Sequence, residues 1–246
     1  MIDACYFLSD LHLGSDEEPK AFLLIEFLQK LKSREQITKL FLVGDVFDMW
    51  LAAHIHYQNR YQKVIAELAR LKSIGVELHY FEGNHDMYLE HFFERQLGAK
   101  IYKGPGVFQL CGKRVRIEHG DQMDPDDYGY KALRWFWRTP VLKWLAPRLP
   151  ERVIVSIGDN LSEASREYNS DVKILSDDRA RQILRNHAQK IWSESPFDLL
   201  ITGHTHVKDD YTMSPPSSAR VINLGSWFDE PKAFFLNHER AEFVKI

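Results

Sequence analysis

The chain has 246 residues, 44% of them hydrophobic and 27% charged, with a formal net charge of -3. This is the composition of an ordinary globular protein, and the small net charge gives no overall field that would attract nucleic acid, so we expect no nucleic-acid partner. Two cysteines, Cys5 and Cys111, are too few for a disulfide framework and too far apart for a CxxC metal site. No signal peptide and no apolar stretch of membrane-spanning length is evident, so we expect a cytoplasmic protein.

Strands and helices alternate in the first 99 residues. Three short apolar runs have the length of buried strands: residues 4–8, 40–43 and 76–81. Two segments between them carry apolar residues at helical spacing: about 19–31 and 59–73. Pro19 opens the first of these helices and Gly75 follows the second, which are common positions for these two residue types. The order predicts right-handed parallel βαβ units.

Beyond about residue 99 the chain is richer in short strands. These are predicted at residues 107–110, 114–118, 199–202, 220–224 and 233–236. Two groups of strands fit this order better than one doubly wound sheet does. We therefore expect an α/β sandwich with two sheets.

A mostly helical segment, about 124–195, interrupts this rhythm and is expected to be an insertion above the strand ends within a single domain, 1–246. Its part from 130 to 150 contains no Asp or Glu and has cations at positions 131, 134, 138, 143 and 148. Large apolar residues lie among them. The segment is either a helical hairpin with an aromatic core, or a cap that holds acyl chains or rests on a membrane while its cations meet anionic groups.

Polar residues follow five of the predicted strands, where open α/β sheets bind ligands. They are Asp10, His12, Asp45, Asn84, His85, Asp86, His119, His204 and His206. Oxygen and imidazole donors without thiolates suit Mn²⁺, Fe or Zn²⁺. In an extended segment, residues i and i+2 point the same way, so Asp10 with His12 and His204 with His206 can each present two donors to one site.

Seven metal donors among these nine residues are too many for one tetrahedral zinc ion, and they suit two metals that share a carboxylate. Asp45 stands alone between the paired donors, and we expect it to be the bridge. Two metals can clamp a phosphoryl group and lower the pKa of a bound water. Any one of these residues alone is more often a turn former. His54 and His56 share the i, i+2 spacing but follow no strand, and we expect them to lie outside the site, as we do for His79, His91, His187 and His238.

The five motifs Asp-Leu-His at 10–12, Gly-Asp at 44–45, Gly-Asn-His-Asp at 83–86, His-Gly-Asp at 119–121 and Gly-His-Thr-His at 203–206 resemble those of the calcineurin-like metallophosphoesterases. The resemblance implies a four-layer α/β/β/α sandwich with a helical cap insertion and two divalent metal ions, Mn²⁺ first, with Fe or Zn as alternatives. It assigns one metal to Asp10, His12, Asp45 and His206, and the other to Asp45, Asn84, His119 and His204. His85 would stabilise the transition state or protonate the leaving oxygen, with Asp86 or Asp48 as its orienting partner.

Within that superfamily the chain is most similar to the UDP-2,3-diacylglucosamine pyrophosphohydrolases of lipid A biosynthesis. Its length, the motifs around Asp10 and Asp45, the position of the helical insertion and the Ser-x-x-x-Asn pattern at 165–169 carry this match. The best-known branch has arginine where this chain has His85, which is the general superfamily residue. The substrate-binding residues implied are Asn84, His85, Asp127, Ser165, Asn169, Lys173 and His204.

The implied reaction is hydrolysis of the pyrophosphate of UDP-2,3-diacylglucosamine to UMP and 2,3-diacylglucosamine 1-phosphate. The partners implied are this nucleotide-lipid and, as a peripheral contact, the cytoplasmic face of the inner membrane. Two alternatives stay open: a metallophosphoesterase for another phosphoester, such as a nucleotide or phosphodiester, and a non-enzymatic scaffold that binds partners through its cap. The sequence makes no prediction of the oligomeric state.

Overall fold

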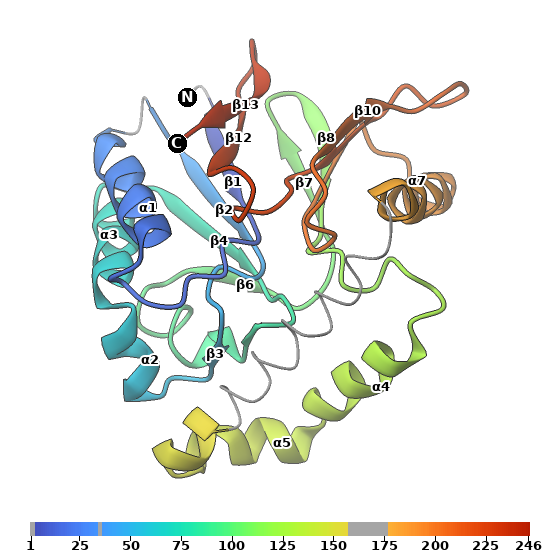
Figure 1. The fold of residues 1–246 in the computed structure, drawn as a ribbon. Helices are drawn as coiled ribbons and strands as arrows, with labels where there is room; N and C mark the ends of the chain where they lie inside the picture. Colours follow the sequence, from blue (N-terminus) through green and yellow to red (C-terminus); the bar gives the residue numbers. More distant parts are fainter. Residues whose placement is uncertain (1–2, 34–35, 157–176) are drawn as a thin grey trace.

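The computed structural model describes residues 3–33, 36–156 and 177–246, and in them two large sheets lie face to face (Figure 1). The first sheet has the order β13 (Ala241–Lys245), β12 (Lys232–Leu236), β1 (Cys5–Leu8), β2 (Lys39–Val43), β4 (Glu77–Phe81) and β6 (Lys100–Tyr102). The second has the order β10 (Asp209–Thr212), β11 (Arg220–Asn223), β9 (Leu199–Thr202), β8 (Lys113–Ile117) and β7 (Gly106–Leu110).

The N-terminal half forms the parallel units that its pattern predicts. β1 pairs with β2, β2 with β4 and β4 with β6, all in parallel. Helices α1 (Pro19–Lys30) and α3 (Gln62–Ser73) cover the outer face of this sheet. Leu24 of α1 and Leu68 of α3 are buried in the same cluster as Leu40 and Leu42 of β2.

Alternation along β2 separates two hydrophobic layers, because successive side chains of a strand point to opposite faces. Leu40 and Leu42 face the helices, whereas Phe41 and Val43 face the second sheet. Phe41 stacks on Phe7 with ring centroids 4.8 Å apart. Burying one such side chain stabilises the fold by about 1.5–3 kcal/mol.

The outer face of the second sheet is covered by α7 (Asp177–Glu194). Leu184, Ala188 and Ile191 of this helix share a buried cluster with Leu200 of β9 and Val221 of β11. The layers are therefore helix, sheet, sheet, helix, which confirms the expected four-layer sandwich. Helix α7 lies at the C-terminal end of the segment 124–195, and it packs on a sheet face.

Helices α4 (Tyr128–Trp137) and α5 (Pro140–Leu145) follow one another past the lower ends of the sheets in Figure 1, and the short helix η2 (Ala146–Arg148) follows α5. Pro140 begins α5, so the two helices do not fuse into one. No side chain of α4 or α5 is buried. Within the described part of the chain, the aromatic residues of these two helices therefore form no buried core.

Some elements differ from the predicted pattern. The helix expected at 59–73 is two helices, α2 (Ile55–Arg60) and α3, because Tyr61 between them has a φ of -121°. The strands β6, β10 and β13 were not predicted, nor were β3 (Trp50–Leu51), β5 (Asp86–Met87) and the short helix η1 (Leu89–His91). β3 and β5 have only two residues each, too few to show a hydrophobic period, and β6, β10 and β13 contain no buried residue.

Candidate metal centre

Five loops meet where β1, β2, β4, β8 and β9 end, and they carry the seven predicted ligands. The strand register brings the first two loops together: the amide of Asp10 donates to the carbonyl of Gly44 (3.2 Å), and that of His12 donates to the carbonyl of Asp45 (3.0 Å). The ligand atoms form overlapping groups, of which one contains Asp10, His12 and His206 and another Asp45, His119 and His204; within each group the atoms lie no more than 4.8 Å apart.

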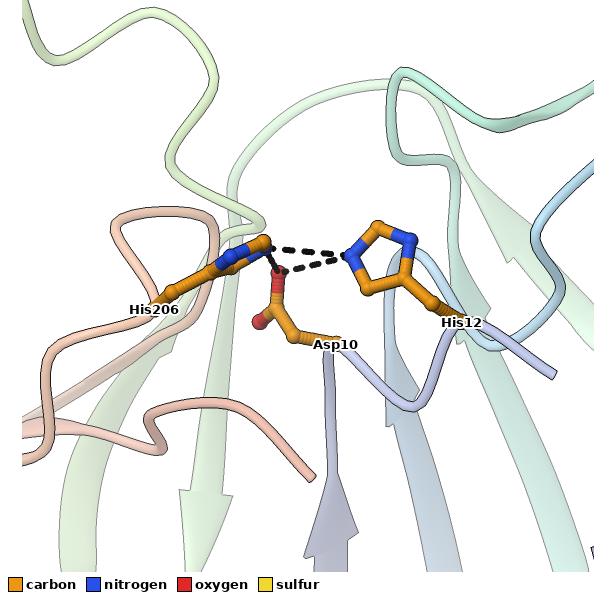
Figure 2. A group of neighbouring side chains, drawn as sticks. All are labelled: Asp10, His12 and His206. Carbon is orange, nitrogen blue, oxygen red and sulfur yellow. Dashed lines mark hydrogen bonds and ion pairs between the residues drawn. The ribbon is translucent and has the colours of Figure 1, made fainter. Parts of the chain in front are cut away.

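The first group joins the loop after β1 to the loop after β9. Figure 2 shows the imidazoles of His12 and His206 on the two sides of the Asp10 carboxylate, with their nitrogens directed inward. Nε2 of His12 lies 3.1 Å from Nε2 of His206, and the latter atom lies 3.3 Å from Oδ1 of Asp10. All three side chains are largely buried.

The second group is centred on Asp45 and Asn84. Oδ2 of Asp45 lies 3.5 Å from Nε2 of His119 and 3.8 Å from Nε2 of His12, so this carboxylate stands between the two groups. Oδ1 of Asn84 lies 3.2 Å from Nε2 of His119 and 3.1 Å from Nδ1 of His204. The Asp45 carboxylate thus lies close to histidines of both groups, and its part as a bridge between two metals stays a prediction.

The backbone at these loops is not extended. Of the eight described non-glycine residues with positive φ, five are predicted ligands: Asp10 (54°), His12 (45°), Asp45 (53°), His204 (70°) and His206 (60°). Such left-handed residues are uncommon and concentrate at functional sites. The extended-segment argument is therefore wrong for His204 and His206, which the loop divides between the two groups. The division follows the family pattern.

Three glycines let the loops approach this closely. A Cβ on Gly44 would lie 2.3 Å from Nδ1 of His119, and one on Gly203 would lie 2.3 Å from Oδ2 of Asp10. A Cβ on Gly83 would lie 2.0 Å from Oδ1 of Asp45. Real Cβ atoms do not come so near to polar atoms, so only glycine fits at these positions.

Backbone groups hold the ligands in place. The amide of His204 donates to Oδ2 of Asp10 (2.9 Å), and the hydroxyl of Ser9 donates to the same oxygen (2.5 Å). Nδ1–H of His119 donates to the carbonyl of Val43 (2.9 Å). Outer bonds of this kind fix the tautomer and the ring orientation of a metal-binding histidine.

The carboxylates and imidazoles of the centre shift one another's pKa values. Burial opposes ionisation of Asp45, but the neighbouring histidines, His119 foremost, hold its pKa well below its usual range. Burial likewise disfavours the cationic form of His119, but the Asp45 carboxylate raises its pKa to about 10. Burial lowers the pKa of His12 to about 3. The buried carboxylates therefore call for positive charge at the point where the histidine nitrogens converge.

A divalent cation fits this arrangement. With Nδ1–H of His119 donated to the carbonyl of Val43, Nε2 of the ring points at Oδ1 of Asn84, 3.2 Å away. A cation bound between these two atoms would accept a lone pair from each and would replace the proton that the Asp45 carboxylate otherwise holds on His119. Oxygen and imidazole donors suit Mn²⁺, Fe or Zn²⁺.

His85 lies beside the centre. Its ring contacts that of His12 edge-on at 4.7 Å, and its Nδ1–H donates to the backbone carbonyl of Asp48 (2.8 Å). Its amide donates to Oδ1 of Asp45 (3.0 Å). A ring held through Nδ1 directs its Nε2 to the side opposite Asp48.

Asp86 holds the framework of the centre. Its Oδ2 accepts from the amide of Val46 (2.9 Å) and from the hydroxyl of Tyr80. Burial, and next the charge of Asp45, raise the pKa of Asp86 well above its usual value. These contacts indicate that Asp86 positions the loop that carries Asp45; its predicted catalytic part stays a prediction.

Of the predicted substrate residues in the helical segment, Asp127 is described. Its Oδ1 accepts from the amide of Tyr130 (2.8 Å) and so caps the N-terminus of α4. Ser165, Asn169 and Lys173 lie outside the described residues. Substrate contact by all four stays a prediction.

Three cations of α4 and α5 meet carboxylates of the sandwich. Nε of Arg134 lies 2.7 Å from Asp121, Arg138 lies 3.0 Å from Glu82, and Lys143 lies 2.9 Å from Glu90. Tyr130 also donates to Asp121, and its ring lies 6.2 Å from that of His204. These helices are thus fastened next to the centre through ion pairs that the sequence pattern did not indicate, since their acidic partners are far away in the chain.

The histidines that we expected to lie outside the site belong to other contacts. Nε2–H of His54 donates to the carbonyl of Ala146 (2.9 Å), and Nδ1 of His56 lies 3.7 Å from Glu151. His187 pairs with Glu118 on β8's end. None of these three belongs to a ligand group within the described residues.

Phe228 is a neighbour of the centre that the sequence reasoning missed. It follows β11, which runs parallel to β9, so its loop emerges at the same sheet edge as the ligands. The strand-end argument, applied to residues 220–224 as well, places this loop at the same edge but does not distinguish its aromatic residue.

Comparison with known proteins identifies relatives over most of the chain. A family profile described as calcineurin-like phosphoesterase matches residues 5–208. Proteins named UDP-2,3-diacylglucosamine hydrolase are similar: that of Histophilus somni strain 129Pt is 27% identical over 90% of this chain and 91% of its own length. The protein of that name from Aeromonas salmonicida is 29% identical over 91% of this chain and 86% of its own length. That of Enterobacter sp. strain 638 is 26% identical over 99% of both chains.

No helix among the described residues is long and apolar enough to cross a bilayer.

Proposed function

Because this chain belongs to the calcineurin-like phosphoesterase family and is a phosphoester hydrolase that uses divalent metal ions, we propose that its substrate is UDP-2,3-diacylglucosamine. The products would be UMP and 2,3-diacylglucosamine 1-phosphate, in lipid A biosynthesis. Relatives named for this substrate match about nine tenths of the chain, which supports the proposal.

The observation that carries the proposal is an apolar surface beside the candidate metal centre. We call it the α4–α5 apolar surface, and its exposed residues are Tyr128, Leu133, Trp135, Phe136, Val141 and Trp144. Trp135 is 73% exposed and Trp144 60%. Exposed apolar side chains gathered on two neighbouring helices are typical of a surface that binds lipid or protein. A substrate with two acyl chains needs such a surface next to the reacting phosphates.

The centre would hold two divalent cations. Asp10, His12, Asp45 and His206 would bind one, and Asp45, Asn84, His119 and His204 the other. We propose Mn²⁺, with Fe or Zn as alternatives. When bound, these cations polarise the phosphoryl oxygens and make the attacking water more acidic.

The side chains around the cations have separate tasks. His85 and Asn84 would contact the phosphates, and His204 would lie at the side that faces α4. With Nδ1–H donated to Asp48, His85 presents Nε2 to the phosphate, where its proton can stabilise negative charge or pass to the leaving oxygen. Asp86 keeps the loop of Asp45 in register through the amide of Val46.

We also propose that the protein acts at the cytoplasmic face of the inner membrane as a peripheral protein. The cations Arg134, Arg138 and Lys143 are paired with carboxylates of the sandwich. Contact with lipid would therefore rest on the α4–α5 apolar surface, with Trp135 and Trp144 as its largest side chains.

The test compares two substrates in the presence of Mn²⁺. The native protein should hydrolyse UDP-2,3-diacylglucosamine to UMP. Replacing Trp135 and Trp144 together by alanine should lower kcat/KM for the lipid at least tenfold and leave that for a small aryl phosphodiester within about twofold, because only the lipid reaches this surface. Phe22 on α1 is 48% exposed, and the control variant F22A should leave kcat/KM unchanged for both substrates. Efficient cleavage of the aryl ester with an intact UDP-lipid would overturn the proposal in favour of another phosphoester.

A further inference from the structure

Phe228 lies in a loop that is bonded to the candidate metal centre. The amide of Trp227 donates to the carbonyl of Asp10 (3.1 Å), and the amide of Phe228 donates to the hydroxyl of Ser226 (3.1 Å). The Trp227 indole is buried and donates through Nε1 to the carbonyl of Lys232 (2.8 Å). The backbone that carries Phe228 is thus anchored to the centre and to the start of β12.

The Phe228 ring lies against two of the predicted ligands. It is nearly parallel to the imidazole of His12, with an interplanar angle of 21° and centroids 5.5 Å apart, and it is 6.4 Å from His206. The ammonium of Lys20 lies 4.2 Å from its centroid and donates to the carbonyls of Leu11 and His12. Nevertheless 59% of Phe228 is exposed.

An aromatic ring that is mostly exposed on an anchored backbone is better suited to binding than to packing. A buried phenylalanine would stabilise the fold by the apolar area it removes from water, and Phe228 forgoes more than half of that gain. The loop that presents it is nevertheless tied to the backbone of Asp10. Its open surface therefore stands ready beside the site of phosphate chemistry.

Phe228 and α4 flank different parts of the centre. Phe228 neighbours His12 and His206 of the first ligand group, whereas Tyr130 of α4 neighbours His204 of the second. A nucleotide-lipid diphosphate extends from its phosphates in two directions, with the nucleoside on one side and the acylated sugar on the other. If the acyl chains lie at α4, the nucleoside of the substrate extends toward Phe228.

We propose that Phe228 is the stacking platform for the pyrimidine base of the nucleotide substrate. This inference rests on the proposed function, because it takes the substrate to be a nucleotide. An aromatic ring offers a base an offset-stacked or edge-on contact that tolerates different bases. Lys20 fixes the ring from the side of the loop backbone through its cation–π contact.

The experiment measures binding of UMP and of ribose 5-phosphate, which lacks the base, to the Mn²⁺-loaded protein by titration calorimetry. The native protein should bind UMP about tenfold more tightly than ribose 5-phosphate, and F228A should reduce this ratio to near one by weakening UMP alone. F228Y, which keeps a ring, should restore it. F22A is the matched control, since Phe22 is also exposed and has a lysine ammonium, that of Lys63, 5.8 Å from its ring.

A ratio that stays unchanged in F228A, or a native protein that binds the two ligands equally, would overturn the inference. Equal weakening of both ligands would also overturn it, because it would show that Phe228 only supports His12. Thermal unfolding of each variant checks that it folds. The proposed function is judged separately by cleavage of the UDP-lipid. If F228A loses the preference for UMP and the native protein does not cleave the UDP-lipid, the stacking role of Phe228 is supported and the lipid substrate is rejected.

Discussion

Gly83 and Asp45 approach so closely that a Cβ on the glycine would lie 2.0 Å from Oδ1 of the carboxylate and 2.7 Å from the Asp45 amide nitrogen. Parallel pairing of β2 with β4 brings the two loops to the same sheet edge. The missing side chain then lets Asn84 and His85 lie against Asp45, as the bond from the His85 amide to Oδ1 shows.

Gly83→Ala should therefore displace Asp45 from the centre. We expect bound Mn²⁺ and phosphodiesterase activity to fall at least about tenfold to hundredfold, the range typical of lost support around a metal ligand. Gly104→Ala is the matched control, because a Cβ there meets nothing within 4 Å. Metal content by elemental analysis and kcat/KM on an aryl phosphodiester measure the effect. Unchanged metal content in the Gly83 variant would show that Asp45 is not a ligand.

Arg138→Met should loosen α4 and destabilise the fold. Glu82 has a side chain only 3% exposed, and Arg138 lies 3.0 Å from it. Removing one partner of a buried pair leaves an uncompensated charge, which costs about 3–5 kcal/mol in unfolding free energy before the carboxyl takes up a proton. Burial already raises the pKa of Glu82, and loss of Arg138 raises it further.

Arg148→Met is the control for that variant. The Arg148 guanidinium donates to the backbone carbonyl of Trp144 and lies over the Trp144 ring, so these contacts involve no carboxylate. Urea denaturation measures the stability, and hydrogen exchange of α4 measures the loosening. The double change Glu82→Gln with Arg138→Met should recover part of the loss. Equal stability of the two arginine variants would contradict a clamp at Glu82.

The free energy of unfolding should decrease as pH falls, over a range set by His79. Burial lowers the pKa of this β4 histidine to about 4, while the unfolded chain has an ordinary histidine pKa. Between these values the unfolded state binds more protons, so stability decreases as pH falls from about 6.5 to 4, by up to about 3 kcal/mol. Lys100 adds to the shift, and Glu77, 3.6 Å from Nε2, opposes it.

His79→Gln keeps a hydrogen-bonding group near Tyr102, whose hydroxyl lies 3.0 Å from Nδ1 of His79, but it does not titrate. The difference in unfolding free energy between native and variant should shrink from pH 7 to pH 4. Two stability curves that run parallel over this range would show that His79 does not titrate differently in the folded and unfolded states.

His85→Ala separates two roles of the imidazole. If Nε2–H protonates the leaving oxygen, kcat should fall more for a substrate with a poor, basic leaving group than for one with a good leaving group. If His85 only stabilises charge, both substrates should lose kcat equally. We expect the first result, because the bond from Nδ1–H to the carbonyl of Asp48 orients the ring so that the imidazolium form can deliver its Nε2–H to the leaving oxygen.

The layers, and which residues gather at the candidate metal centre, could be predicted from the sequence because they depend on local order. Continuous apolar runs such as 40–43 indicate strands covered on both faces, and a polar residue at the end of each parallel strand emerges at one sheet edge. That is why Asp45 and its neighbours could be placed at one edge from their sequence positions. The same argument places the loop after β11 at this edge, but it does not single out the aromatic ring of Phe228.

The tertiary structure decided what depends on contacts between distant residues. Left-handed backbone angles at His204 and His206 send the two rings to different groups, which an extended-strand argument cannot foresee. Arg134, Arg138 and Lys143 looked like free cations because their carboxylate partners lie 13 to 56 residues away along the chain. Sequence by itself gives the chemistry that each strand end carries. Only the packed chain settles which charges neutralise one another and which apolar side chains stay exposed, because burial depends on neighbours that are remote in sequence.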